Sequence, residues 1–120
     1  MASEAFIRKV SNEIKRVVGR IIAGELKDPR IGMASVVHVD LSPCLRHAKI
    51  YVSVVGDEQQ RKYTMDGIKH ATGHIRTELG ERTRLKYLPE LVFFADTSVD
   101  YAQHIDEVLK AAEAAEEELE

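Results

Sequence analysis

Two histidines one helical turn apart are the first residues in this sequence whose spacing could support chemistry. His70 and His74 would project from the same face of a helix, as metal-ligating histidines can. The zinc-protease pattern His-Glu-x-x-His also needs a glutamate base directly after the first histidine, and position 71 is an alanine. We therefore interpret the two histidines as surface residues and expect no metal site.

Glu90 and Asp96 are the candidate pair of catalytic carboxylates, because they share the parity of one predicted strand. They would lie about 20 Å apart at ~3.3 Å per residue, which is too far for concerted acid–base catalysis. The sequence also contains no glycine-rich phosphate loop and no nucleophile elbow. We therefore expect no enzymatic activity, no catalytic residue and no cofactor.

A run of cations in residues 76–86 suggests a different kind of chemistry, namely contact with phosphate groups. Clustered basic side chains are typical of such contacts, which depend on salt and hardly on base identity. Intramolecular ion pairing is the alternative, since Glu78, Glu81 and Glu90 are close in sequence. The cations of the run are Arg76, Arg82, Arg84 and Lys86.

Charge is distributed unevenly along the chain. Residues 1–88 carry 16 Lys and Arg against 10 Asp and Glu, a net charge of +6. Residues 89–120 carry one Lys against 10 acids, a net charge of −9. The overall charge of −3 therefore hides a basic body with an acidic end. Such asymmetry indicates a nucleic-acid or membrane-surface partner, and RNA or DNA becomes a working hypothesis.

Length and composition predict a single domain that can bury one core, because the chain has 120 residues and 44% of them are hydrophobic. Its one cysteine, Cys44, can form neither an internal disulfide nor a thiolate cluster. No apolar run approaches the roughly 18 residues of a membrane span, and the first ten residues lack the apolar segment of a signal peptide. We expect a cytoplasmic protein with no membrane partner.

The elements that must position these residues follow from hydrophobic periodicity. Residues 6–22 have a helical stripe, with Ser3 as a possible N-cap, and Pro29 prevents continuation beyond residue 27. Residues 33–41 and 47–55 alternate as strands, and their short polar connection predicts an antiparallel pair. In the first strand, the alternation places Met33, Ser35 and Val37 on one face with Val39 and Leu41. Cations on the polar face of the first helix include Lys9, Arg16 and Arg20, for which an ordinary solvated face is the alternative.

A second long helix is predicted from Asp57, where Gln60 completes a capping box. Its apolar stripe runs through Ile68, Ala71, Ile75 and Leu79, beside exposed positions that include Lys69. The segment Ala71-Thr72-Gly73 interrupts the pattern and predicts a bend. We expect the bend to require Gly73, so that Gly73→Ala destabilises the protein or impairs binding. The alternative is a glycine that only lets another backbone come close.

The chain closes with a short apolar strand over residues 90–96 and a final helix that begins at Thr97, where Asp100 completes a capping box. Residues 1–110 are expected to form the domain. Residues 111–120 form an acidic tail that is expected to fray, because it has little to bury and a run of like charge. The predicted order is α-β-β-α-(kink)-α-β plus a C-terminal helix, an α+β fold with a three-stranded sheet packed on helices.

Four groups of residues carry a resemblance to a known family. They are Lys27-Asp28-Pro29-Arg30 after the first helix, residues 48–54 (AKIYVSV), Gly73-His74-Ile75-Arg76 after the bend, and residues 89–93 (PELVF) leading to Asp96. The element order without its last helix resembles a type II K-homology RNA-binding domain, whose GxxG loop clamps single-stranded RNA. This chain has no GxxG, and the Ala-x-Gly in its place resembles the bacterial ribosome-binding factor A family.

The resemblance covers about residues 6–109 and implies a single-domain type II K-homology-like fold. It also implies a ribosome biogenesis factor that binds the immature small (30S) ribosomal subunit and its 16S rRNA. Such a factor supports late maturation and 5′-end processing of that rRNA, a task most needed in the cold. We expect it to act as a monomer. The alternative is a free-standing single-stranded RNA-binding K-homology module, which the missing GxxG and the shortage of aromatic residues on the basic stripes disfavour.

The residues expected to bind RNA are the basic residues and histidines of the first helix, the turn after it, the bend and the run that follows. They are Lys9, Arg16, Arg20, Arg30, Lys69, His70, His74, Arg76, Arg82, Arg84 and Lys86, with Ala71, Thr72 and Gly73 as the kink motif.

Overall fold

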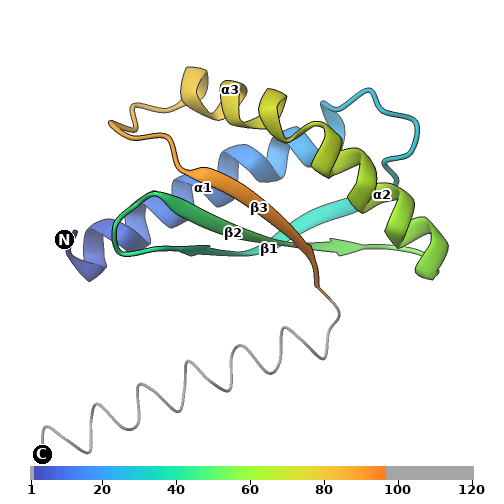
Figure 1. Cartoon of the computed structure of the whole chain (residues 1–120), viewed down its shortest axis with the longest axis horizontal. Helices are drawn as coiled ribbons and strands as arrows, with labels where there is room; N and C mark the ends of the chain where they lie inside the picture. Colours follow the sequence, from blue (N-terminus) through green and yellow to red (C-terminus); the bar gives the residue numbers. More distant parts are fainter. Residues whose placement is uncertain (1, 97–120) are drawn as a thin grey trace, which may run out of the picture.

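A computed structural model describes residues 2–96 of the chain (Figure 1). The predicted final helix from Thr97 and the acidic tail lie outside these residues. The described elements follow the predicted order and form an α+β fold with a three-stranded sheet packed on helices. They are α1 (Glu4–Gly24), β1 (Ala34–Leu41), β2 (His47–Val54), α2 (Glu58–His70), α3 (Thr72–Arg82) and β3 (Glu90–Ala95).

Helix α1 begins and ends where local chemistry predicts. The Ser3 hydroxyl accepts a hydrogen bond from the backbone N–H of Phe6 at 3.2 Å, which confirms the N-cap. The helix ends at Gly24, ahead of Pro29, and the N–H of Glu25 closes the last turn on the Ile21 carbonyl. One stripe of the helix is buried against the sheet: Val10, Ile14, Val17, Val18, Ile21 and Ile22.

Strands β1 and β2 pair antiparallel, as predicted, and Ala48, Ile50, Val52 and Val54 of β2 all point into the core. The predicted single face of β1 is wrong in its first half. A β-bulge between Val36 and His38 leaves one extra residue there, so the inward parity changes from even to odd positions. Consequently Met33 is 75% exposed and Ser35 is exposed, whereas Val39 and Leu41 are buried as predicted.

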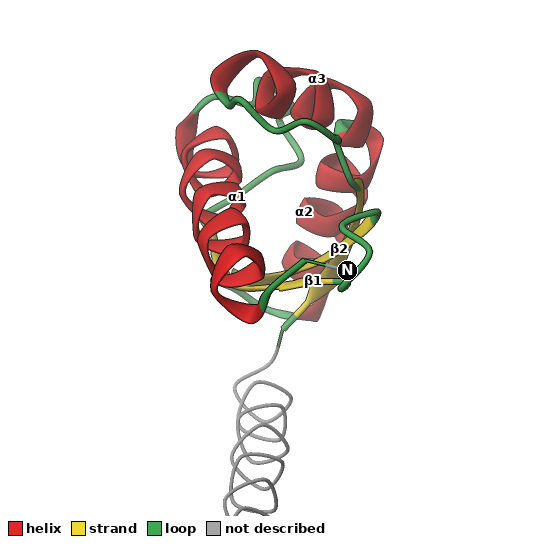
Figure 2. Cartoon of the chain, turned by 90° about the vertical axis from the view of Figure 1, so that its left-hand side faces the viewer, coloured by secondary structure: helices red, strands yellow, loops and turns green. Residues whose placement is uncertain are grey.

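Strand β3 pairs parallel with β2, giving the order β1-β2-β3. Helices α1, α2 and α3 all lie on one side of the sheet, as Figure 2 shows in end view. Leu91 and Phe93 of β3 complete the core between the two layers. None of the helices within residues 2–96 has the length and hydropathy needed to cross a membrane.

The second helical region begins with the predicted capping box. The Asp57 carboxylate accepts from the N–H of Gln60 at 2.8 Å, and the Gln60 side chain accepts from the N–H of Asp57 at 3.1 Å. The predicted core stripe is confirmed, because Ile68, Ile75 and Leu79 are fully buried.

The predicted bend is also present, as a break between α2 and α3 at Ala71, where φ is −87° and ψ is 3°. The prediction that this geometry requires Gly73 is wrong. Gly73 does not have a positive φ, and a Cβ built on it would meet nothing within 4 Å. The folded structure therefore gives no reason for Gly73→Ala to destabilise the protein, while its effect on binding stays a prediction.

Candidate nucleic-acid interface

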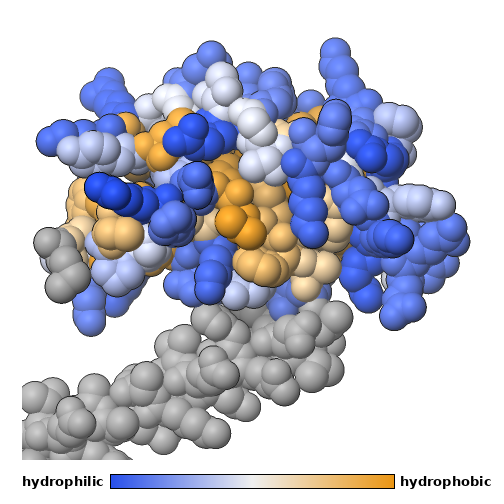
Figure 3. All heavy atoms as spheres, viewed as in Figure 1, coloured by the Kyte–Doolittle hydropathy of each residue, from blue (hydrophilic) through white to orange (hydrophobic). Residues whose placement is uncertain are grey.

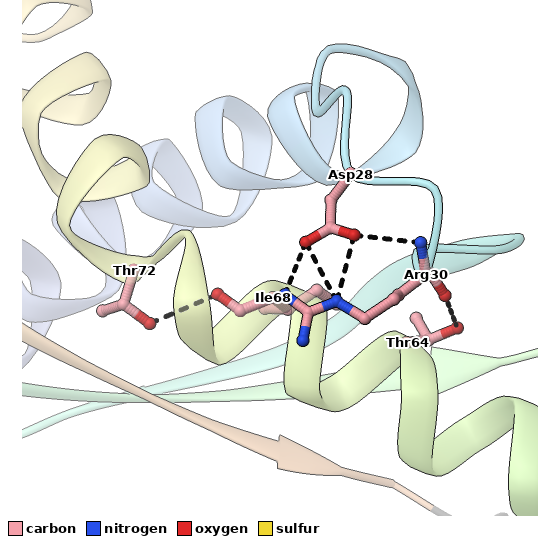
Figure 4. Close-up of polar contacts among 5 residues, drawn as sticks. All are labelled: Asp28, Arg30, Thr64, Ile68 and Thr72. Carbon is pink, nitrogen blue, oxygen red and sulfur yellow. Dashed lines mark hydrogen bonds and ion pairs between the residues drawn. The ribbon is translucent and has the colours of Figure 1, made fainter.

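The break between α2 and α3 is built by a few hydrogen bonds around Ala71. Its N–H donates to the carbonyls of Gly67 and Ile68, each at 3.1 Å, and its own carbonyl accepts from the N–H of Ile75 at 2.9 Å. The Thr72 hydroxyl donates to the Ile68 carbonyl at 3.3 Å (Figure 4). The break therefore ends one helix and starts another within a single residue.

The residues predicted at the bend surround this break and are exposed: Lys69, His70, Gly73 and His74. Lys69 and His70 lie in the last turn of α2, where the helix dipole favours positive charge. No side chain of the described residues caps the first turn of α3. The first N–H groups of a helix can bind an anion where neither a side chain nor a preceding carbonyl accepts from them.

The turn Asp28-Pro29-Arg30 is fixed against α2 beside the break. The Arg30 guanidinium donates to the Asp28 carboxylate, with Nη2 to Oδ2 at 2.7 Å and Nε to Oδ1 at 3.1 Å, and the N–H of Arg30 adds a bond at 2.9 Å (Figure 4). These hydrogen bonds lower the pKa of Asp28 to about 2, and the nearby charge of His70 acts in the same direction. The predicted RNA contact Arg30 therefore already has an internal carboxylate partner.

Two α2 residues, neither of them predicted, hold this turn in place. The Thr64 hydroxyl is buried, donates to the Arg30 carbonyl at 3.4 Å and accepts from the N–H of Gly32 at 3.1 Å. Gly67 allows the close approach, because a Cβ there would lie 2.7 Å from Cγ1 of Ile31. The available sequence signal was a glycine inside a helical pattern, which can mark close packing.

Arg76 makes two hydrogen bonds to the segment that leads into β3. Its Nε donates to the Pro89 carbonyl at 3.0 Å and its Nη2 to the Leu88 carbonyl at 2.9 Å. Pro89 is buried and Leu88 is half-buried. Arg76 therefore joins α3 to the start of β3, a structural function that its place in the basic run did not indicate.

Arg82 is held by two carboxylates. Its guanidinium binds Glu25 through two bonds, at 2.6 and 2.7 Å, and Glu78 through Nε at 3.1 Å. These hydrogen bonds raise the pKa of Arg82 and, together with the charge of Arg20, lower the pKa of Glu25. The ion-pairing alternative therefore applies to Arg82, through one predicted partner and one, Glu25, that no local pattern indicated.

The remaining predicted cations lie on exposed surface in two places. Arg84 and Lys86 follow α3, and the Lys86 Nζ lies 5.5 Å from the centre of the Tyr87 ring, which is 63% exposed. Tyr87 is a candidate base-stacking residue that was not predicted, although its position next to Lys86 was a usable signal. The second place is the polar face of α1, with Lys9, Arg16 and Arg20.

Within residues 2–96, the fold and this surface define the class: a small type II K-homology-like domain with a helix break flanked by basic residues. The model of the family "Ribosome-binding factor A" matches residues 7–109. The chain belongs to this family.

Individual relatives agree with the match. Ribosome-binding factor A of Halothermothrix orenii is 46% identical over 110 residues, which cover 92% of this chain and 90% of that protein. The crystal structure of ribosome-binding factor A from Thermus thermophilus is similar with a TM-score of 0.66 and 25% identity, over 74% of this chain and 94% of that one. A homology model of the T. thermophilus factor, fitted into a cryo-EM map of its complex with the 30S subunit, has a TM-score of 0.60 and 25% identity, over 70% and 88% of the two chains.

Proposed function

We propose that this protein is an assembly factor that binds the immature small (30S) ribosomal subunit and its 16S rRNA. It supports late maturation and 5′-end processing of that rRNA, and it is most needed at low temperature. The observation that carries the proposal is family membership, together with similarity to a factor whose homology model is fitted into a map of a 30S complex. The factor acts in the cytoplasm as a monomer, by binding and without catalysing a reaction.

The break between α2 and α3 is the proposed centre of RNA contact. Lys69, His70 and His74 supply donors around it, and the start of α3 supplies backbone N–H groups and the positive end of a helix dipole. Because a Cβ at Gly73 would meet nothing, the glycine leaves room for a phosphate to approach the backbone. This is a role for Gly73 in binding that does not depend on its φ.

The other predicted cations divide into two groups. Lys9, Arg16 and Arg20 on α1, with Arg84 and Lys86 after α3, extend the proposed contact with phosphates. A second group already has internal partners, and we assign to it the positioning of the segments around the break: Arg30, Arg76 and Arg82.

The test is sedimentation of the tagged protein with immature small subunits, mature small subunits and bare rRNA. Lys69→Glu should weaken binding to immature subunits, whereas Lys62→Glu, an equal charge change on the exposed face of the same helix, should not. Gly73→Asp should abolish binding by placing a carboxylate at the start of α3, and the isosteric Gly73→Asn, which fills the same space without the charge, should weaken binding less. If Lys69→Glu and Lys62→Glu behave alike, the break is not the contact.

Salt dependence separates phosphate contact from indirect effects. A variant that removes one phosphate interaction should reduce the slope of log affinity against log salt by roughly 0.7–0.9. A titration with short single-stranded oligonucleotides addresses the alternative function: strong binding there would favour a free-standing K-homology module over an assembly factor.

A further inference from the structure

The face of the sheet that points away from the helices carries a row of three aromatic rings. His38 of β1, Tyr51 of β2 and Phe94 of β3 are register partners across the sheet. The ring centroids of His38 and Tyr51 are 5.7 Å apart, and those of Tyr51 and Phe94 are 5.6 Å apart with nearly stacked planes. The bulge in β1 creates the row, because the change of parity brings His38 onto the outer face.

This face continues as apolar surface along β3. Val92 is 45% exposed and Phe94 is 41% exposed, whereas Leu91 and Phe93, their neighbours on the inner face, are buried. The space-filling view shows apolar surface gathered over β3 (Figure 3). Helices α1, α2 and α3 are all on the opposite side of the sheet (Figure 2). An exposed strand with apolar residues on both faces is typical of a sheet that packs between two layers.

The chain itself continues from the end of this strand. The N–H of Asp96 still donates to the Val52 carbonyl at 2.8 Å, so the next residues start at the edge of the aromatic row. Residues 97–109 carry an apolar stripe at helical spacing, formed by Tyr101, Ile105 and Val108. Thirteen helical residues span about 20 Å at 1.5 Å per residue, the same length as the six residues of β3 at ~3.3 Å each.

We propose that residues 97–109 form a helix that folds back under the sheet and packs Tyr101 and Ile105 against the row formed by His38, Tyr51 and Phe94. The row is then an intramolecular docking site for the C-terminal segment. The protein has three layers, with α1, α2 and α3 on one side of the sheet and this helix on the other. Contact with RNA is left to the helical side that carries the basic residues.

Two properties favour this occupant over a single-stranded RNA or a second copy of the chain. The segment is joined directly to β3, so it meets the row at the high effective concentration of a short tether. Residues 97–120 also carry eight acids against one lysine, and this net charge of −7 next to the row opposes the approach of RNA. The aromatic row can thus be closed by the chain's own apolar stripe without any partner.

A double-mutant cycle on the full chain tests the docking. Phe94→Ala and Ile105→Ala should each lower the melting temperature by several degrees, and the double variant should lose less than the sum of the two. Gln103→Ala is the control, because Gln103 lies off the apolar stripe. Its effect on the melting temperature should add to that of Phe94→Ala. Additive losses for Phe94 and Ile105 would overturn the proposal.

A second measurement uses a substitution outside the sheet, so that no residue of the aromatic row is changed. In Ile105→Asp the amide and ring resonances of Tyr51 and Phe94 should shift, those of buried α1 residues such as Val17 should stay, and protection of residues 98–109 from hydrogen exchange should be lost. Unchanged Tyr51 and Phe94 resonances would exclude the segment as the occupant. Coupling between Phe94 and Ile105 that appears only as the protein concentration rises would identify a second copy of the chain as the occupant. Equal shifts of the Tyr51 and Phe94 resonances, when a short oligonucleotide is added to wild type and to Ile105→Asp, would identify RNA as the occupant.

Discussion

Arg82 and Glu25 lie 57 residues apart in the chain, yet they form a two-bond ion pair that joins the end of α3 to the end of α1. Glu78 adds a third carboxylate bond from within α3. A guanidinium in this position is occupied by the protein's own carboxylates, which explains why a basic run in sequence does not translate directly into a basic surface.

The first prediction concerns this pair. Arg82→Glu should lower the melting temperature, because three carboxylates then face one another, and Glu25→Arg in the same chain should restore part of the loss. Arg84→Glu is the matched control, with an equal change of charge two residues away and no stability effect expected. Thermal unfolding of the four proteins measures the coupling. Equal losses of melting temperature in Arg82→Glu and Arg84→Glu would show that the ion pair between Arg82 and Glu25 does not stabilise the protein.

Arg76 should behave as a structural residue. Removing its bonds to the carbonyls of Leu88 and Pro89 in Arg76→Ala should cost about 1–2 kcal/mol of unfolding free energy, since hydrogen bonds to charged groups are stronger than neutral ones. Arg76→Lys should restore little, because an ammonium lacks the planar fork. Denaturant unfolding gives both values. If Arg76→Ala leaves the unfolding free energy unchanged and reduces subunit binding, Arg76 contacts phosphate directly instead.

Two helical glycines should respond to alanine in opposite directions. Gly67→Ala places a Cβ against Ile31 and should destabilise the protein by about 1–3 kcal/mol through overpacking. Gly73→Ala meets open space at ordinary backbone geometry and should stabilise it by ~0.4–1 kcal/mol. Denaturant unfolding of both variants, with subunit binding of Gly73→Ala, checks the pair. A less stable Gly73→Ala would mean that the break does depend on this glycine.

Acid should weaken the turn beside α2. The pKa of Asp28 is lowered from 3.8 to about 2 in the folded protein, so its carboxylate contributes stability above the unfolded value. That contribution is lost as the pH falls through the range from about 4 to about 2. The stability difference between wild type and Asp28→Asn should therefore be constant from pH 7 to 5 and shrink toward pH 2. A difference independent of pH would show that the carboxylate charge is not what Arg30 binds.

The acidic tail should be dispensable. Truncation after Lys110 removes five glutamates and a thin apolar stripe, so thermal stability should stay nearly unchanged and subunit binding should be equal or tighter. Truncation after Asp96 is the informative contrast, since it also removes the segment proposed to cover the aromatic row and should lower the melting temperature. Loss of subunit affinity on removing residues 111–120 alone would assign the tail a binding role.

Features that depend on neighbours in the chain were predictable from sequence. The Ser3 N-cap, the Asp57–Gln60 capping box and the alternation of β2 each involve residues within a few positions, where backbone geometry alone places the partners. The break at Ala71 belongs to the same group. The family resemblance supplied the type II K-homology-like assignment and the small-subunit hypothesis, which periodicity and charge did not contain.

Tertiary structure decided everything that depends on partners distant in sequence. The bulge that brings His38 beside Tyr51, the approach of Ile31 to Gly67 and the pairing of Arg82 with Glu25 join elements whose relative position no local pattern encodes. Sequence alone therefore determined which residues are basic and helical, and which face of α1, β2 and the second helical region is buried, but not the buried face of the first half of β1. Which of the arginines have an internal partner was decided by packing, because a guanidinium donates to whichever carboxylate or carbonyl the fold places within hydrogen-bond distance.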